Sequence, residues 1–419
     1  MQHQLKRAGL FLLALLAVIC LLPNPASHAA GSGPQGIYQR AWQLVRDSYY
    51  DPSFNHQDWE TWHHKYDGQL QTNDEAFGAV KKMLASLNDP YTRFLDPKAF
   101  SEEDDAINSV VVGIGISLRP FTEAHALVIN DVIEGGPASR AGLTFGDEIV
   151  AIDGQATKDF DTEKAASKIR GTAGTPVDIT YKRGSGQKAV HIVREQVSIP
   201  AVSTKLLEHN IGYIKLATFM SDDASTEFRA ALQKLSGTNG IVLDLRDNPG
   251  GLLANAVEIA NMLMDHGKIV TTCSRHGNNT DSCDGNVLTY QPITLLVDKD
   301  SASASEILAG ALKDNGRANI VGTVTYGKGL VQEINRLPGA CGLHITVARY
   351  LTPNGSDINK IGIKPDVQID QRDKQLDAAI QVLQTKIASR GGVNSGAQLM
   401  AAPPKRYGFG TLKSVSPRS

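Results

Sequence analysis

Ser303 and Lys328 are the two residues whose types and settings could support nucleophilic chemistry. Ser303 lies in the sequence SASASE at residues 301–306, where small residues follow a buried apolar stretch and open a predicted helix. Amides at a helix start offer positive potential to a developing oxyanion, so a serine there could act as a nucleophile. The Ser-x-x-Glu spacing is also a capping box, and local pattern alone favours Ser303 as a helix cap.

Lys328 lies in the sequence TYGKGLVQ at residues 325–332. Together with Gly322 it gives a spacing that nearly matches a phosphate-binding P-loop. That motif needs Ser or Thr directly after the lysine to hold magnesium, and here the residue is Gly329. The sequence therefore argues against nucleotide binding.

A neutral lysine amine can act as a general base that takes the proton of a serine hydroxyl. An ordinary lysine has a pKa of about 10.4 and is charged at neutral pH. Burial without a carboxylate partner lowers that pKa. No acidic residue occurs between Ala318 and Gln332, which is compatible with the Ser–Lys variant of the catalytic triad.

A glycine-bearing turn is the third candidate element. The sequence DNPGG at residues 247–251 follows the continuous apolar stretch 240–245, which predicts a strand buried on both faces. The carboxyl end of such a strand is where α/β sheets place ligand sites, and paired glycines let backbone amides approach a ligand. The sequence suggests no metal site, and it leaves His266, His276 and His344 open as alternative bases.

Several kinds of element must position these residues. Periodic apolar residues and a capping box at Thr72 predict helices over residues 36–97, and strands alternate with helices from residue 196 onward, which predicts an α/β layered domain. Between them lie short alternating strands with a helix at 161–169. We expect a signal peptide, an N-terminal helical region, a small β-rich domain, the α/β core, a C-terminal helix and a flexible basic tail at residues 1–30, 31–98, 99–195, 196–370, 371–390 and 391–419.

Composition limits the class of protein, and the N-terminal sequence indicates its compartment. The chain has 419 residues, of which 41% are hydrophobic and 21% charged, and its net charge of −2 argues against a nucleic-acid binder. Lys6 and Arg7 precede an apolar run at 10–22 and then small residues, which is typical of a signal peptide, with an uncleaved anchor as the alternative.

Export implies an oxidising compartment, where cysteines pair. Cys273 and Cys283 bracket a polar loop and could close it as a disulfide, with Cys341 left over. The sequence leaves the connectivity among the three thiols open.

Six stretches of the sequence together resemble the carboxyl-terminal-processing, or tail-specific, protease family over roughly residues 36–370. Their order and spacing are specific, whereas any one stretch alone is not. The matching stretches are NDPYT at 88–92, the glycine turn at 247–251, SASASEILAGAL at 301–312, GKG with its following glutamine at 327–332, YLTPNG at 350–355 and GIKPD at 362–366.

The resemblance implies that Ser303 is the nucleophile rather than a cap, that Lys328 is the base, and that Gln332 orients the lysine. It also implies an oxyanion hole made by the backbone amides of Ala304 and Gly251. The fold it implies for the core is an α/β protease with crotonase-like or ClpP-like layers.

The resemblance further implies that residues 99–195 form a PDZ domain. Gly113-Ile114-Gly115-Ile116 looks like the loop that holds the carboxylate of a peptide C-terminus, and the peptide would add as a strand beside it. Arg170 is a candidate link between peptide binding and the protease core, and a solvated arginine at a helix end is the alternative.

The expected function is ATP-independent cleavage of protein substrates near their C-terminal tails, in the periplasm and without a cofactor. We expect a homo-oligomer, for which the N-terminal helices and the helix at 376–387 are candidate surfaces, and an adaptor protein as a further partner. Two rivals stay open: a binding protein on the same fold, and a protease that rests inactive until a partner or substrate aligns Lys328.

Overall fold

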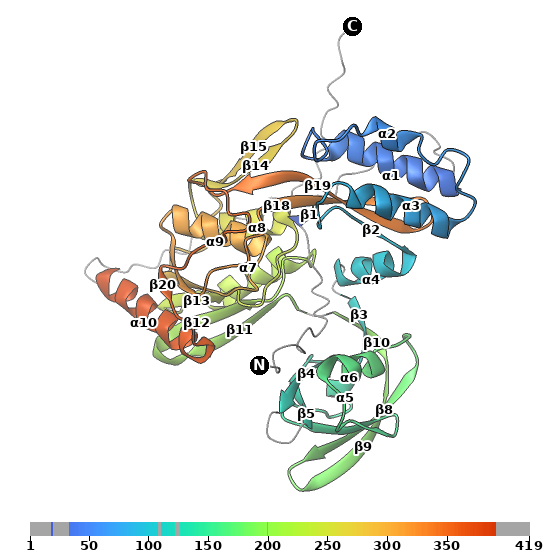
Figure 1. The fold of residues 1–419 in the computed structure, drawn as a ribbon. Coiled ribbons are helices and arrows are strands. Elements are labelled where there is room, and N and C mark those ends of the chain that lie inside the picture. The colour runs from blue at the N-terminus through green and yellow to red at the C-terminus, as the bar shows by residue number, and fades with distance from the viewer. Residues whose placement is uncertain (1–17, 20–32, 108–109, 122–125, 199, 391–419) are drawn as a thin grey trace, which may run out of the picture.

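The computed structural model describes residues 18–19, 33–107, 110–121, 126–198 and 200–390 (Figure 1). Of the predicted signal peptide, only strand β1 (Val18–Ile19) lies within these ranges, and the predicted tail at 391–419 lies outside them. No helix in the described ranges is long and apolar enough to cross a membrane.

A mostly parallel sheet forms the centre of the α/β core. Its order is β11-β12-β13-β16-β17-β20, and only β11 runs antiparallel to its neighbour. Every residue of β13 (Gly240–Asp244) and β16 (Ile293–Val297) is buried, as their mostly apolar sequences predict. The remaining strands are β11 (Val202–Leu207), β12 (Ile211–Leu216), β17 (Ala318–Gly322) and β20 (Val367–Gln368).

Helices cover both faces of this sheet (Figure 1). Helix α10 (Arg372–Arg390) lies on one face, where Leu383 packs in one cluster with Val242. The apolar side of residues 376–387 is therefore covered by the chain's own sheet, so it no longer argues for an oligomer. The helices on the other face are α7 (Ala224–Lys234), α8 (Leu253–Leu263) and α9 (Ala304–Asp314).

A second sheet, which the sequence did not lead us to expect, packs on the far side of α9. Its order is β1-β18-β19-β14-β15, with β2 also paired to β19. Residues Leu343 and Ile345 of β19 face the N-terminal helices, whereas Ala348 and Tyr350 join the core that contains α9. The strands are β2 (Arg93–Leu95), β14 (Lys268–Ser274), β15 (Gly277–Ser282), β18 (Leu330–Leu337) and β19 (Cys341–Leu351).

The N-terminal helices pack on the outer face of this second sheet. The capping box predicted at Thr72 is present, since its hydroxyl accepts from the amide of Glu75 and the Glu75 carboxylate accepts in return. Trp59 is buried, so the aromatic residues of this region form core. The helices are α1 (Pro34–Ser48), α2 (Glu60–His63) and α3 (Asn73–Ala85).

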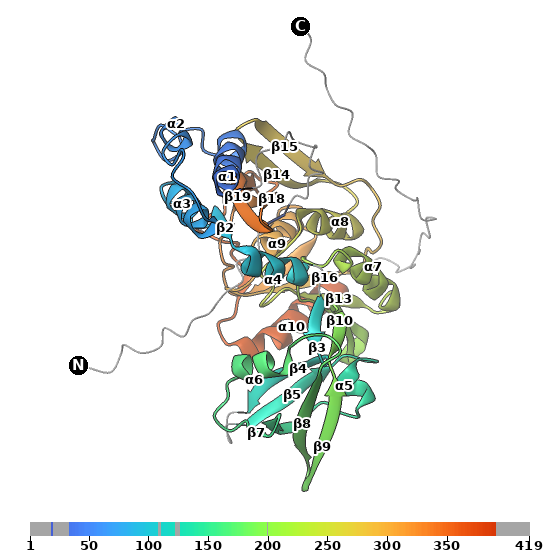
Figure 2. The ribbon, with the colours of Figure 1, turned by 90° about the vertical axis from the view of Figure 1, so that its right-hand side faces the viewer.

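A two-stranded ribbon connects a small β-rich domain to the core (Figures 1 and 2). The ribbon consists of β3 (Val110–Gly113) and β10 (Glu195–Ser198), which pair antiparallel. β3 ends at Gly113, and Ile114 and Gly115 separate it from the next strand. The domain contains β4 (Ile116–Phe121), β5 (Ala126–Val132), α5 (Pro137–Arg140), β6 (Glu148–Ile152), β7 (Gln155–Ala156), α6 (Thr162–Ile169), β8 (Pro176–Arg183) and β9 (Gly186–Val193).

Helix α4 (Pro97–Ile107) joins the core to this ribbon. It runs across the division expected at residue 98, where the sequence pattern was interpreted as a change from helices to strands. Acidic residues dominate its second half, which gave little apolar periodicity to find.

The suggested Cys273–Cys283 disulfide is wrong. β14 and β15 form a hairpin in which Cys273 pairs opposite Asn278 near the turn. The Cys283 amide instead bonds to the carbonyl of Gly267, at the opposite end of the hairpin. Strand geometry separates the two positions by about 20 Å, far beyond disulfide reach, and all three described thiols are free.

Candidate active site

Ser303 occupies a strained turn between β16 and α9. Its φ of 57° and ψ of −115° lie outside the regions that side-chain-bearing residues favour. Gly250 makes the turn possible, because a Cβ there would lie 2.6 Å from the Ala302 carbonyl oxygen and 2.9 Å from Ser303 Cβ. Such strain at a serine between a buried strand and a helix is a recurrent feature of nucleophile turns.

The hydroxyl of Ser303 does not cap its helix. The Glu306 amide donates to the Ser303 carbonyl oxygen at 2.8 Å, which leaves that amide committed elsewhere. Among the described residues, the buried Ser303 Oγ has no hydrogen-bond partner. Since a buried hydroxyl without a partner costs free energy, this one is kept for something other than stability.

Glu306 fastens the serine segment to the lysine segment. Its Oε2 accepts from the amides of Ser303 and Lys328, both at 2.9 Å. Its Oε1 accepts from the amide of Gly327 at 2.7 Å and from Thr325 Oγ1 at 2.5 Å. The carboxylate is fully buried, and burial raises its pKa. Sequence reasoning took Glu306 only as half of a cap and missed this bridge.

Lys328 is 1% exposed, and burial together with the positive charge of Arg93 lowers its pKa to about 7. Its ammonium nitrogen lies 5.1 Å from the ring centroid of Tyr91. A lysine with such a pKa is substantially neutral at neutral pH and can accept a proton. Gln332, also 1% exposed, places its Nε2 3.4 Å from Thr346 Oγ1.

The structure brings Ser303 and Lys328 to one site without joining their side chains. Within the described residues, no hydrogen bond links Ser303 Oγ to Lys328 Nζ. A cavity of about 200 Å³ lies beside Tyr91 and Gln332, with Pro90, Arg93 and His344 completing its lining. The segments are thus assembled, whereas the dyad contact itself is not made.

The glycine turn reaches the start of α9. Asn248 holds it there, because its carbonyl oxygen accepts from the Ala302 amide at 3.0 Å and from Ser305 Oγ at 2.9 Å. In the part of the chain that the structure describes, the amides of Gly251 and Ala304 donate to no protein group. Two free amides beside a serine can receive an oxyanion.

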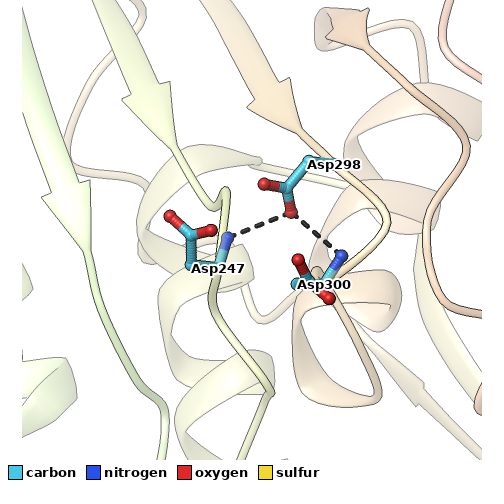
Figure 3. A group of neighbouring side chains, drawn as sticks. All are labelled: Asp247, Asp298 and Asp300. Carbon is cyan, nitrogen blue, oxygen red and sulfur yellow. Dashed lines mark hydrogen bonds between the residues drawn. The ribbon is translucent and has the colours of Figure 1, made fainter. Parts of the chain in front are cut away.

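Three carboxylates, of Asp247, Asp298 and Asp300, gather next to this turn (Figure 3). Oδ1 of Asp298 accepts from the amides of Asp247 at 3.0 Å and Asp300 at 3.1 Å. Arg372 donates to Asp298 Oδ2 at 2.6 Å and also binds Asp247. One guanidinium therefore already pairs with two of the three carboxylates, and Lys299 pairs with Asp300. These contacts tie the loop after β16 to the glycine turn.

The loop predicted to hold a peptide carboxylate joins β3 to β4. Gly115 has φ of 77°, and the buried Ile114 accepts from the Ala138 amide at 2.8 Å. Arg170 directly follows α6 and is exposed, and a Cβ on Gly113 would lie 4.0 Å from its Cγ. The structure thus brings Arg170 to the start of this loop, well away from Ser303.

Comparison with family models matches three parts of the chain. Residues 210–369 match peptidase family S41, residues 128–183 match the PDZ domain, and residues 34–76 match the tricorn protease C1 domain.

Similar proteins cover most of the chain. A carboxyl-terminal-processing protease of Picosynechococcus is 41% identical over 376 residues, which are 87% of this chain and 91% of that protein. A carboxyl-terminal-processing protease of Synechocystis is 36% identical and covers 85% and 86% of the two chains. The solved structure of a photosystem II D1 C-terminal processing protease superposes with a TM-score of 0.56 at 35% identity, covering 85% of this chain and 98% of its own.

Proposed function

Because this chain belongs to the carboxyl-terminal-processing proteases of peptidase family S41 and is a serine-type peptidase with a PDZ domain, we propose that Ser303 is its nucleophile and Lys328 its general base. The observation that carries this assignment is the buried Lys328, whose pKa of about 7 suits a general base. The peptide backbone of that lysine shares the Glu306 carboxylate with the backbone of Ser303.

The reaction proceeds through an acyl-enzyme. Ser303 Oγ attacks the peptide carbonyl carbon while Lys328 Nζ takes the hydroxyl proton. The oxyanion is held by the amides of Gly251 and Ala304. The lysine then protonates the leaving amine. A water molecule, deprotonated by the same lysine, attacks the ester, and the lysine returns that proton to Ser303 Oγ as the acid product leaves. Gln332 orients the amine from the neighbouring strand.

Substrates enter by their C-terminal tails. The tail carboxylate binds at Gly113-Ile114-Gly115-Ile116, the tail lies as a strand beside β4, and Arg170 contacts the bound end. Cleavage needs no ATP or cofactor. The core follows crotonase-like layering, which the α10, sheet, α7–α9, sheet order supports.

The protein is exported by its N-terminal signal peptide and acts in the periplasm. We further propose that it forms a homo-oligomer and works with an adaptor. Light scattering of the mature protein tests whether it forms a homo-oligomer, and a monomeric mass would refute that proposal.

The free Ser303 hydroxyl favours a second, related possibility from the two rivals named above: the protease rests inactive and completes its dyad when a tail binds. Cleavage of a reporter peptide, measured with and without a separate tail peptide, distinguishes a constantly active protease from one that rests inactive. Only the resting enzyme is accelerated by the tail peptide.

The test is cleavage of a fluorogenic peptide library with free C-termini by purified mature protein. Ser303→Ala and Lys328→Ala should each lose activity by at least about a thousandfold, as expected for a nucleophile and its base. Ser356→Ala and Lys364→Ala, at exposed positions, are the matched controls. Cleavage by either catalytic variant at the rate of the controls would refute the dyad.

A further inference from the structure

Helix α4 is anchored on the sheet that carries the lysine segment, and it leads directly to the PDZ domain. Its Phe100 ring rests on Gly342 of β19, where a Cβ would lie 2.2 Å from the ring. The glycine is thus required for the close approach. One turn further along the helix, Glu103 reaches the same strand two residues on, at His344.

Glu103 holds two cationic or titratable side chains at once. Its Oε2 accepts a hydrogen bond from Nη2 of Arg93 at 3.0 Å. Its Oε1 lies 2.8 Å from Nε2 of His344 as a close polar contact whose angles do not make it a hydrogen bond. His344 is 1% exposed and the Glu103 side chain is 10% exposed, so this contact is shielded from water. Burial keeps the pKa of His344 low, while the pKa of Glu103 is also lowered by its two partners.

Sheet register places these side chains on the face that holds Gln332. His344 pairs opposite Arg93 on β2 and opposite Ile334 on β18, and opposite residues of an antiparallel pair project to one side. Gln332 lies two residues from Ile334 and shares that side. Arg93, His344 and Gln332 together line the cavity beside Tyr91, over whose ring Lys328 lies.

We propose that Glu103 is a positioning residue that couples the PDZ domain to Lys328: its carboxylate holds Arg93 and His344 against the lysine pocket, and a movement of α4 transmitted through β3 loosens or tightens that hold. This inference rests on the proposed Ser–Lys function, since it concerns the regulation of the same site.

The charges around Lys328 predict the direction in which its pKa changes when Glu103 is replaced. Arg93 from β2 lowers the pKa of Lys328, whereas Glu103 from α4, Glu306 from α9 and Asp89 raise it. Removing the Glu103 charge therefore lowers the pKa of Lys328. The acid limb of the pH dependence of kcat/KM then moves to lower pH, which a merely structural defect would not cause.

The experiment compares wild type with Glu103→Gln on one cleaved library peptide, made with a free C-terminus and as the C-terminal amide. We expect the wild type to cleave the peptide with the free terminus faster. In Glu103→Gln we expect that preference to fall by about fivefold or more, the lower end of ordinary coupling between sites, and the acid limb to move to lower pH. Glu60→Gln is the matched control, because Glu60 faces His63 at 3.9 Å on the surface.

A second variant separates position from charge. His344→Asn removes a neutral partner and leaves the Arg93–Glu103 pair, so it should weaken the preference for a free terminus without moving the acid limb. Urea unfolding checks that each variant is folded. A Glu103→Gln enzyme that keeps both the preference and the acid limb of the wild type overturns the proposal.

Hydrogen exchange makes the outcome independent of activity. A tail peptide that binds the PDZ domain by fluorescence anisotropy should slow amide exchange in α4 and in residues 328–332 of the wild type, and not of Glu103→Gln. Absence of that effect in the wild type refutes the coupling. A wild type that shows the effect but cleaves no peptide retains the coupling and refutes the proposed proteolysis.

Discussion

Glu306→Gln is the sharpest test of how the site is held together. The carboxylate accepts from three backbone amides and one hydroxyl. A glutamine of the same shape has one acceptor oxygen and one donor nitrogen. Its best orientation keeps the oxygen toward the amides of Ser303 and Lys328. The nitrogen then donates to Thr325 Oγ1, which can also accept from Ile363, but it faces the Gly327 amide as a second donor.

The magnitude follows from these bonds. One buried amide, that of Gly327, loses its acceptor, at a cost of about 1–3 kcal/mol. The two bonds that remain lose the assistance of a full negative charge, about 1 kcal/mol each. We therefore expect the free energy of unfolding to fall by about 3–5 kcal/mol. Because the same bonds fix Lys328 relative to Ser303, kcat/KM should fall by about a hundredfold or more.

Urea unfolding and peptide cleavage measure the two effects. The matched control is Glu227→Gln on α7. Glu227 is half-buried and, like Glu306, accepts a backbone amide, that of Val202 at 2.9 Å, away from the site. It should cost stability and leave kcat unchanged. Glu306→Gln with stability within about 1 kcal/mol of wild type and unchanged kcat/KM would mean that the carboxyl group is not an ionised acceptor, and the reasoning would fail.

Three further predictions concern the lysine and the thiols. Because Lys328 must be neutral to act as a base and its pKa is about 7, kcat/KM should rise with pH to a plateau above that value; a profile flat from pH 5 to 8 would contradict this. Lys328→Met should abolish cleavage yet raise the free energy of unfolding, because the lysine is protonated more readily in the unfolded chain. This gain in the free energy of unfolding should be full below about pH 7 and shrink toward pH 10. A variant less stable than the wild type at pH 6 would contradict it. The mature protein, unfolded without reductant, should react with maleimide at three sites per molecule, and a single reacting thiol would restore a disulfide among Cys273, Cys283 and Cys341.

The elements that could be predicted from sequence are those buried on both sides. β13 and β16 are mostly apolar because helices cover both faces of their sheet. β18 and β19 were missed because their inner face carries the polar Gln332, His344 and Thr346 around the lysine, which breaks the alternation that signals a strand. β14 and β15 form a largely polar hairpin that gives no apolar pattern at all.

The role of Glu306 had a signal in the sequence that was not used. The residues after it, ILAGAL, are apolar all around the helix, which predicts a helix buried on every side. A carboxylate in such a helix must receive several hydrogen bonds, and capping supplies too few. The partners themselves lie twenty or so residues further on, at Thr325, Gly327 and Lys328, so only the folded chain identifies them.

The structure fixes the backbone around the proposed Ser–Lys dyad and leaves one side-chain contact unmade. Backbone positions are fixed: Glu306 ties the two segments, Asn248 sets the glycine turn, and the Asp298–Arg372 pair closes the loop beside it. The Ser303 hydroxyl and the Lys328 amine make no hydrogen bond with each other. The charged groups that act on Lys328 are Arg93, Glu103, Glu306 and Asp89. Under the proposed regulation Glu103 matters most, because it is the one borne by the helix that leads to the PDZ domain.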